Sequence, residues 1–204
     1  RLPGAYRLAA DSRALIKRCD GLSEVATVRD DYCAIDARWR RLSFDLRNDP
    51  DLPGGVRDPL RTCDRTCSAI AKMLSIEPQF DRQALRDVLI AASTHLQSLE
   101  DDLSLSGISR KRATGLSSDC RLLRQSLIRE AGRVDEVTYE QAVTRFSDFL
   151  TRYRDFAVRM ATIDDPHVQV RLDRIAQCGT ETYALLWMTP PAPAVDVTHL
   201  ADHL

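Results

Sequence analysis

Residues 85–103 read LRDVLIAASTHLQSLEDDL, and within them leucine or alanine recurs at alternating intervals of four and three. The same spacing of apolar residues runs through residues 25–46 and 139–163. Such a repeat places apolar side chains along one face of a helix, where neighbouring helices pack at about 20°. The sequence therefore predicts an all-α fold, an antiparallel bundle of six to seven long helices with heptad-like packing.

Helix-breaking and capping residues divide the chain into seven helical segments. The loop 48–55 contains two prolines and two glycines, which stop a helix. Asp58 and Asp81 are placed to cap helices, and Thr138 begins a capping-box pattern. Asp165 precedes a proline and separates the last two helices. The predicted helices run from about 4 to 20, 23 to 47, 58 to 76, 81 to 103, 108 to 130, 138 to 163 and 166 to 188.

The domain prediction is one helical bundle over residues 1–188, followed by a proline-led tail over 189–204. Shifting residues 8–47 by 81 positions aligns them with 89–128 without a gap and matches several leucines and arginines. Unrelated heptad helices share leucines by chance, so duplication and coincidence both stay open. A true duplication would give repeat units 1–80 and 81–163, with helix 165–188 as a cap.

The charge balance bears on the class of partner. The chain has 29 basic and 30 acidic residues and a formal net charge of −1. This balance gives no electrostatic reason to bind nucleic acid or an anionic membrane surface. No apolar run approaches the roughly 18 residues that a membrane span requires. We therefore expect a protein partner and no membrane span, and the oligomeric state stays open.

The N-terminus and the cysteines bear on the compartment. The chain begins at Arg1 rather than methionine, which favours removal of an N-terminal segment and an extracytoplasmic (periplasmic or secreted) location. Cys19, Cys63, Cys67 and Cys120 fall on predicted apolar helix faces, where free thiols behave as small hydrophobic groups. Disulfides between helices are the alternative and would imply an oxidising compartment. The compartment and the disulfide state both stay open.

Residues typical of catalysis or metal binding are few. His199 and His203 are four residues apart, with Asp196 and Asp202 nearby, so on a helix they would share a face that chelates a metal. Their place in the proline-led tail favours adventitious binding. No glycine-rich phosphate loop is present, and no Glu-x-x-His pair supports a di-iron centre. We therefore expect no cofactor and no enzymatic activity.

Two clusters of basic residues are candidates for binding. Arg38, Trp39, Arg40 and Arg41 are consecutive, and Tyr32 lies two helical turns earlier. Guanidinium groups beside aromatic rings can bind an anion or an acidic partner through bidentate contacts and stacking. Alternatively, the indole belongs to the core and the arginines pair with neighbouring aspartates.

The second basic cluster is Arg110-Lys111-Arg112, which opens a helix at the unfavourable, positive end of its dipole. We expect these side chains to pair with the acidic run 100–102 across the short turn. Together the sequence predicts a non-enzymatic helical scaffold or protein-interaction module of unknown role. The alternatives are a small-ligand or anion-binding bundle that uses the Arg38–Arg41 region and, third, a metal-dependent helical enzyme.

Overall fold

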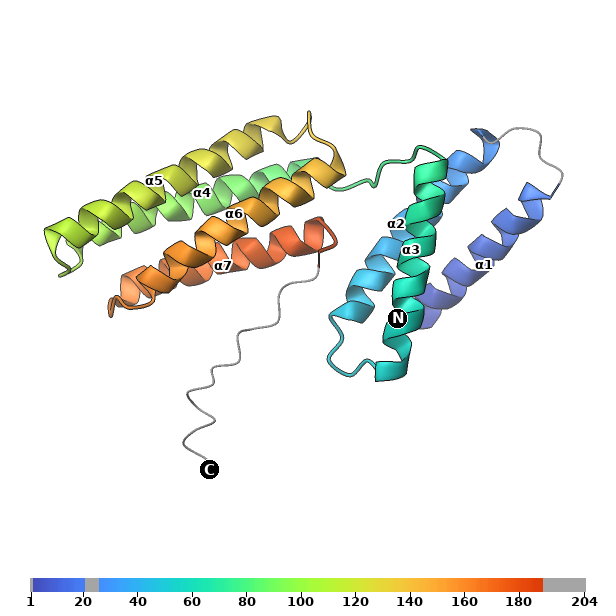
Figure 1. Ribbon diagram of the computed structural model, residues 1–204, viewed down its shortest axis with the longest axis horizontal. Coiled ribbons are helices and arrows are strands. Elements are labelled where there is room, and N and C mark those ends of the chain that lie inside the picture. The colour runs from blue at the N-terminus through green and yellow to red at the C-terminus, as the bar shows by residue number, and fades with distance from the viewer. Residues whose placement is uncertain (1, 21–25, 189–204) are drawn as a thin grey trace, which may run out of the picture.

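The computed structural model describes residues 2–20 and 26–188 (Figure 1). Within these ranges the chain forms seven α-helices and one short 3₁₀ helix, and no strand. The helices pack against one another, which confirms the all-α prediction. The elements are α1 (Leu2–Cys19), α2 (Ala26–Arg47), η1 (Gly54–Val56), α3 (Arg57–Met73), α4 (Arg82–Leu105), α5 (Arg110–Arg133), α6 (Tyr139–Met160) and α7 (Pro166–Leu185).

Three predicted helix starts are confirmed by their capping contacts. The Asp81 carboxylate accepts a hydrogen bond from the Ala84 amide at 2.8 Å. Thr138 and Gln141 form the reciprocal capping box at the start of α6. Asp165 accepts from two amides in the first turn of α7. Each carboxylate or hydroxyl satisfies amides that the helix itself leaves unpaired.

The predicted cap at Asp58 is wrong. The 3₁₀ helix η1 leads directly into α3, so the N-cap residue is Val56, which has no side chain able to accept a hydrogen bond. Asp58 lies inside the first turn of α3 instead. The predicted helix start at residue 23 and the tail 189–204 lie outside the described residues.

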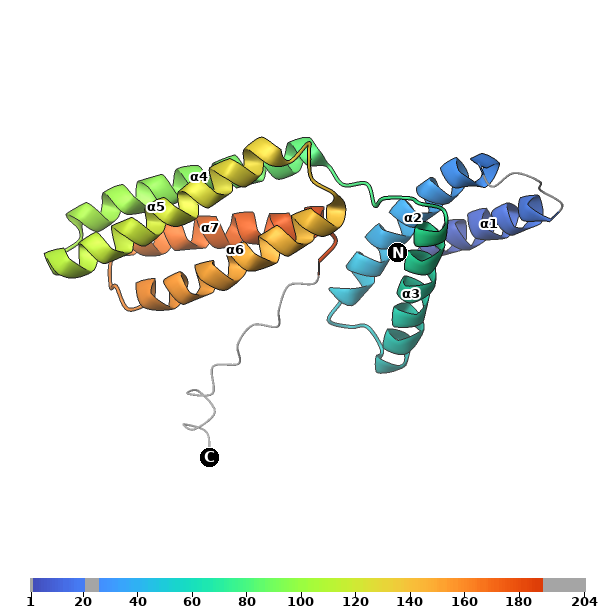
Figure 2. The same ribbon diagram turned by 45° about the horizontal axis from the view of Figure 1, so that its top comes forward.

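The buried apolar side chains form two separate clusters, which divide the molecule into two groups of helices. One cluster lies among α1–α3, the three-helix unit, and the other among α4–α7, the four-helix unit. Residues 74–81 connect the two units (Figures 1 and 2). This division falls at the boundary of the predicted repeat units, whereas α7 shares the core of α4–α6. The duplication itself stays a prediction.

In the four-helix unit, α4 lies beside both α5 and α7, and α6 closes the group against α5 and α7 (Figure 2). The rings of Phe146 in α6 and Tyr183 in α7 meet edge to face at 5.3 Å. Leu96, Leu99 and Phe156 are almost completely removed from solvent. Burial on this scale makes the hydrophobic effect the main stabilising term of the unit.

The three-helix unit has a smaller apolar core, and polar groups make up a larger share of its buried side chains. Leu15 of α1 packs with Tyr32 and Ile35 of α2. Asp36 and Ser43, also in α2, are buried. The unit therefore depends on hydrogen bonds to satisfy these groups, because an unpaired buried polar group is costly.

The cysteines differ in part from the predicted burial. Cys120 is buried as predicted, whereas Cys19 and Cys63 are exposed and Cys67 is half-buried. All six thiols of the chain are free in this structure. The prediction fails for Cys63 because α3 packs mainly on α2, which leaves part of its predicted apolar face in solvent.

Candidate functional site

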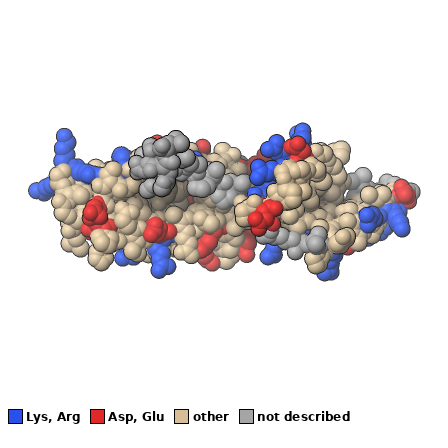
Figure 3. Space-filling model, turned by 90° about the horizontal axis from the view of Figure 1, so that it is seen from below, with Lys and Arg blue, Asp and Glu red and all other residues tan. Residues whose placement is uncertain are grey.

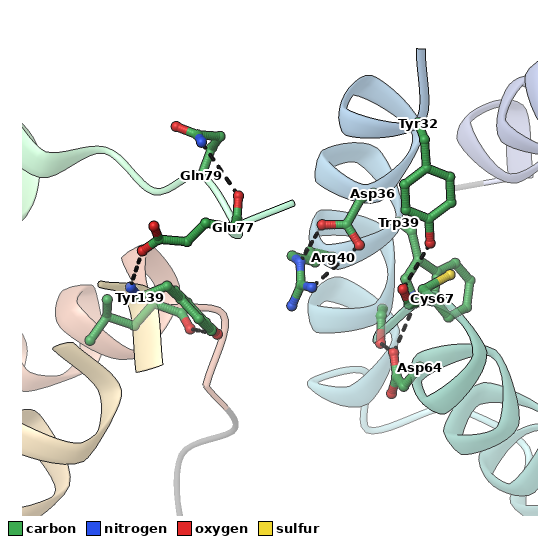
Figure 4. A network of polar contacts seen from close by, with 11 residues as sticks. Tyr32, Asp36, Trp39, Arg40, Asp64, Cys67, Glu77, Gln79 and Tyr139 are labelled. Atoms are coloured by element: carbon green, nitrogen blue, oxygen red, sulfur yellow. Dashed lines mark hydrogen bonds and ion pairs between the residues drawn. The ribbon is translucent and has the colours of Figure 1, made fainter. Parts of the chain in front are cut away.

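The predicted cluster Arg38–Arg41 does not converge on one point. Arg38 forms an ion pair with Asp11 of α1. Arg40 extends towards the four-helix unit and pairs with the buried Asp36, its Nε lying 2.7 Å from Oδ2 (Figure 4). Arg41 is exposed and has no ion pair within the described residues. The three guanidinium groups therefore point in different directions, and two of them already have carboxylate partners.

Trp39 belongs to a polar network between α2 and α3. Its indole nitrogen donates to Asp64 Oδ1 at 2.9 Å, and the Ser43 hydroxyl donates to the same oxygen at 2.7 Å. Arg47 completes the network, since its Nη2 atom lies 3.2 Å from Oδ2 of the same Asp64 carboxylate. The indole is half-buried and hydrogen-bonded, so it holds α3 against α2 rather than presenting a free stacking surface.

Tyr32 connects the same two helices two turns before Trp39 on α2. Its hydroxyl donates to the backbone carbonyl of Cys67 at 2.8 Å (Figure 4). Burial, and then the nearby Cys67, raise the pKa of the Tyr32 phenol well above its usual range. Burial likewise raises the pKa of the Cys67 thiol. Both groups stay protonated at neutral pH, which suits a structural contact.

The two units meet around a polar cavity of about 250 Å³, the inter-unit cavity. The Arg40 guanidinium lies 5.7 Å from the centre of the Tyr139 ring, and the rings of Phe44 and Trp187 meet edge to face at 6.2 Å. The Tyr139 amide also donates to Glu77 Oε1 at 2.7 Å. The cavity is lined by Asp36, Trp39, Arg40, Arg47, Asp64, Cys67, Ser68, Tyr139 and Trp187.

The charges of the inter-unit cavity balance, because its two arginines face two aspartates. One polar atom near the cavity lacks a hydrogen bond. The indole nitrogen of Trp187, a lining residue, is buried and has no acceptor within the described residues. The backbone of Trp187 is left-handed (φ 53°), which is uncommon for a large side chain. The residues that line the cavity therefore carry no excess charge.

A second region lies between α5 and α6 and includes Lys111 and Arg112 of the second predicted basic cluster. Two surface hollows of about 590 and 390 Å³ meet at Arg159, which lines both. We call the two hollows together the basic groove. The first is lined by Ser109, Lys111, Arg112, Gly115, Leu116, Val158, Arg159 and Thr162, and the second by Asp119, Leu122, Leu123, Gln125, Ser126, Arg129, Arg152, Asp155, Phe156 and Arg159.

Positive charge exceeds negative charge in the basic groove by three, since five basic and two acidic side chains line it. Within the described part of the chain, only Arg159 has a carboxylate partner, Asp119. Arg112 donates to the Arg159 carbonyl and the Thr162 hydroxyl. Arg152 donates to the Ser126 hydroxyl and the Asp148 carbonyl. Four cations of the groove thus have no carboxylate partner within the described residues.

The predicted pairing of Arg110-Lys111-Arg112 with the acidic run 100–102 is wrong. Glu100 pairs with Arg121, and Asp102 pairs with Arg171 of α7. Helix α4 ends two residues later than predicted. Its Glu100 and Asp102 side chains reach arginines further along α5 and on α7. Lys111 and Arg112 are therefore left to line the groove.

Apolar side chains lie among these charges. Leu122 is 61% exposed and Val158 is 70% exposed, one on each helix of the groove. A Cβ atom added to Gly115 would meet nothing within 4 Å, so the missing side chain leaves open space. On the face of the molecule drawn in Figure 3, seen from below, basic and acidic side chains are interspersed.

A sequence signal for the groove exists in α6. Arg145, Arg152 and Arg159 recur every seven residues and so lie along one stripe of the helix. Arg145 pairs with Glu130 of α5, and the other two line the groove. The α5 residues of the groove could not be predicted from such a spacing, because their place in the groove depends on which helix packs beside α6.

The described residues contain no group of three or more histidine, cysteine or acidic side chains able to hold a metal ion. His95 is half-buried, and burial together with Arg171 and Arg174 lowers its pKa. The predicted metal ligands His199 and His203 lie outside the described residues. No helix in the described ranges has the length and apolarity to span a bilayer.

Comparisons with protein families, curated proteins and solved structures find no match to this chain. The functional argument therefore rests on the geometry of the inter-unit cavity and the basic groove.

Proposed function

We propose that this chain is a non-enzymatic protein-interaction module and that the basic groove between α5 and α6 is its contact surface. The observation that carries the proposal is the row of groove cations, of which only Arg159 has a carboxylate partner within the described residues. Exposed Leu122 and Val158 lie beside them. Apolar anchors surrounded by charged groups are typical of surfaces that bind proteins.

Site-specific photo-crosslinking tests this proposal. A benzophenone amino acid is placed at Leu122 or Val158 in cells that make the protein, and for comparison at Ile90 or Val170. The comparison sites are exposed apolar positions on α4 and α7. Discrete adducts with another protein are expected from the groove positions and not from the comparison positions. Identical adducts from all four positions, or none from any, would overturn the proposal.

We propose that the helices pack antiparallel in a heptad-like manner and that a three-helix unit was duplicated. Contacts of Arg112 near the start of α5 with Arg159 and Thr162 at the end of α6 support the antiparallel packing. The 81-residue register supports duplication, because the separation between the two apolar clusters falls at its boundary.

A second candidate is the binding of a small ligand or anion in the Arg38–Arg41 region. The observation in its favour is that Arg40, Arg47 and Trp187 line one cavity, and that the buried Trp187 indole nitrogen has no acceptor within the described residues. Titration with inorganic phosphate and with citrate should then change the tryptophan fluorescence. The change should be lost in Trp187→Phe, whereas an unchanged spectrum at every concentration would exclude these anions as ligands.

A further inference from the structure

Resting on the proposed function, we infer that the partner of the basic groove is an acidic amphipathic helix that lies along α5 and α6. The juxtaposition that supports this is two neighbouring hollows along α5 and α6, lined by four cations that have no carboxylate partner within the described residues and by exposed leucine and valine side chains.

The length of the groove fits a helix. Its α5 wall runs from Ser109 to Arg129, which is about 30 Å at the 1.5 Å rise of an α-helix. A partner helix of about 20 residues would span the same distance. Arg159 lines both hollows, so the two hollows follow one another along α5 and α6.

The charge of the groove sets the polar face of the partner. Lys111 and Arg129 are exposed and have no ion pair within the described residues, and Arg112 and Arg152 contact only neutral oxygens. Glutamate or aspartate on both flanks of a docked helix would supply the missing counter-charges. Such complementarity steers association and makes its rate sensitive to salt.

The apolar side chains of the groove determine what the apolar face of the partner helix must contain. Leu122 and Val158 project from the two walls and would pack against apolar side chains spaced at i, i+3, i+4 and i+7 on the partner. The open space above Gly115 admits one larger anchor. These apolar positions, together with Asp119 and Asp155 in the lining, favour a helix over a nucleic acid backbone.

The test uses a fluorescent 20-residue peptide with leucines on one helical face and glutamates on the other. Its binding to the full chain is followed by fluorescence anisotropy, and its helix content by circular dichroism. A peptide of the same composition in scrambled order keeps the charge but removes the apolar face. We expect the patterned peptide to gain helix content on binding and to bind at least about tenfold tighter than the scrambled one, a difference of about 1.4 kcal/mol.

Two test variants and a matched control for each locate the binding. Arg129→Glu with Arg152→Glu reverses two groove charges, and Arg154→Glu with Arg174→Glu reverses two exposed arginines outside the groove lining. The first pair should weaken binding at least about tenfold at low salt and the second pair less than about twofold. Gly115→Trp should fill the groove and also weaken binding at least about tenfold, with Gly115→Ala as its control. Thermal unfolding of each variant verifies that it is folded.

Several outcomes would overturn the inference. Equal binding of the scrambled peptide, equal loss in both charge-reversed pairs, or tighter binding of a short DNA duplex would each exclude an acidic amphipathic helix as the specific occupant. Self-association that disappears in Gly115→Trp would assign the groove to a second copy of the chain. If crosslinking from Leu122 captures a protein but the patterned peptide does not bind, the interaction function stands and this inference fails. If the peptide binds but no crosslink forms in cells, the proposed function fails instead.

Discussion

The described part of the four-helix unit buries twenty-four apolar side chains in one cluster, and that of the three-helix unit buries six. The buried polar groups differ in kind as well. In the four-helix unit they are hydroxyls, such as Ser93 and Thr182, that donate to carbonyls of their own helix. In the three-helix unit they include the carboxylate of Asp36, which depends on the side chain of Arg40.

The four-helix and three-helix units are both all-helical, but they are stabilised in two different ways. Apolar burial is non-directional and tolerates small shifts between helices. The contacts of Asp36 and Asp64 are directional and lost when either partner moves. Since the same network faces the inter-unit cavity, docking against the four-helix unit should contribute to the stability of the three-helix unit.

The largest expected effect comes from the same substitution made in each core. Leu99→Ala removes a side chain with 0% exposure in α4 and should cost about 3–5 kcal/mol. Leu15→Ala in α1 (8% exposed) should cost about 2–3 kcal/mol, because the smaller core can relax around the cavity. Urea denaturation followed by circular dichroism measures both. A larger cost for Leu15→Ala would contradict the comparison.

The directional contacts of the three-helix unit can be broken at Arg40. Arg40→Ala leaves the Asp36 carboxylate, which is 3% exposed, without its cation and should cost about 1.5–3 kcal/mol. Arg38→Ala is the matched control on the same helix, since its ion pair with Asp11 is exposed and should be worth less than about 1 kcal/mol. Equal costs in urea denaturation would show that the buried pair is not special.

Alkaline pH should test the burial of Cys120 in the four-helix unit. Burial, and then the nearby Glu100 and Asp119, raise the pKa of the Cys120 thiol to about 12. Above about pH 8.5 the unfolded thiol loses its proton while the folded one keeps it, so stability falls as pH rises towards 12. The slope attributable to this group is at most about 1.4 kcal/mol per pH unit.

The measurement compares the free energy of unfolding at pH 8 and pH 10 in the wild type and in Cys120→Ala. The wild type should lose about 1–2 kcal/mol more than the variant over this interval. Cys63→Ala, which removes an exposed thiol from α3, controls for the loss of one cysteine. An unchanged difference between wild type and Cys120→Ala at the two pH values would mean that the thiol is hydrated in the folded chain.

Local patterns predicted the helices well because their causes are local. The 3–4 spacing of residues 85–103 corresponds to α4, and the caps at Asp81, Thr138 and Asp165 act within one turn. The prediction that Asp58 caps a helix was wrong because the sequence pattern is ambiguous. A carboxylate before a proline has the same pattern whether it caps a helix or lies inside its first turn.

The candidate sites were harder to predict because they depend on which helices become neighbours. Arg38 and Arg40 are two residues apart, but Arg38 pairs with a carboxylate of α1 and Arg40 with a carboxylate of α2 itself. The basic groove joins Lys111 and Arg159, which are far apart in the chain. Likewise, nothing in the apolar spacing alone showed that the helices would divide into two cores.

The smallest expected effect concerns helix capping, where the two units also differ. In the four-helix unit, Asp81 accepts a hydrogen bond from the Ala84 amide, so Asp81→Ala should cost about 1 kcal/mol. In the three-helix unit, Asp58 lies in the first turn of α3 without a capping bond, so Asp58→Ala should lose only a few tenths of a kcal/mol from the helix dipole. That smaller loss should disappear in about 1 M salt, which screens exposed charges, whereas the loss from Asp81→Ala should persist. Urea denaturation at low and high salt separates the two, and a salt-resistant loss of about 1 kcal/mol from Asp58→Ala would show that this carboxylate caps α3 after all.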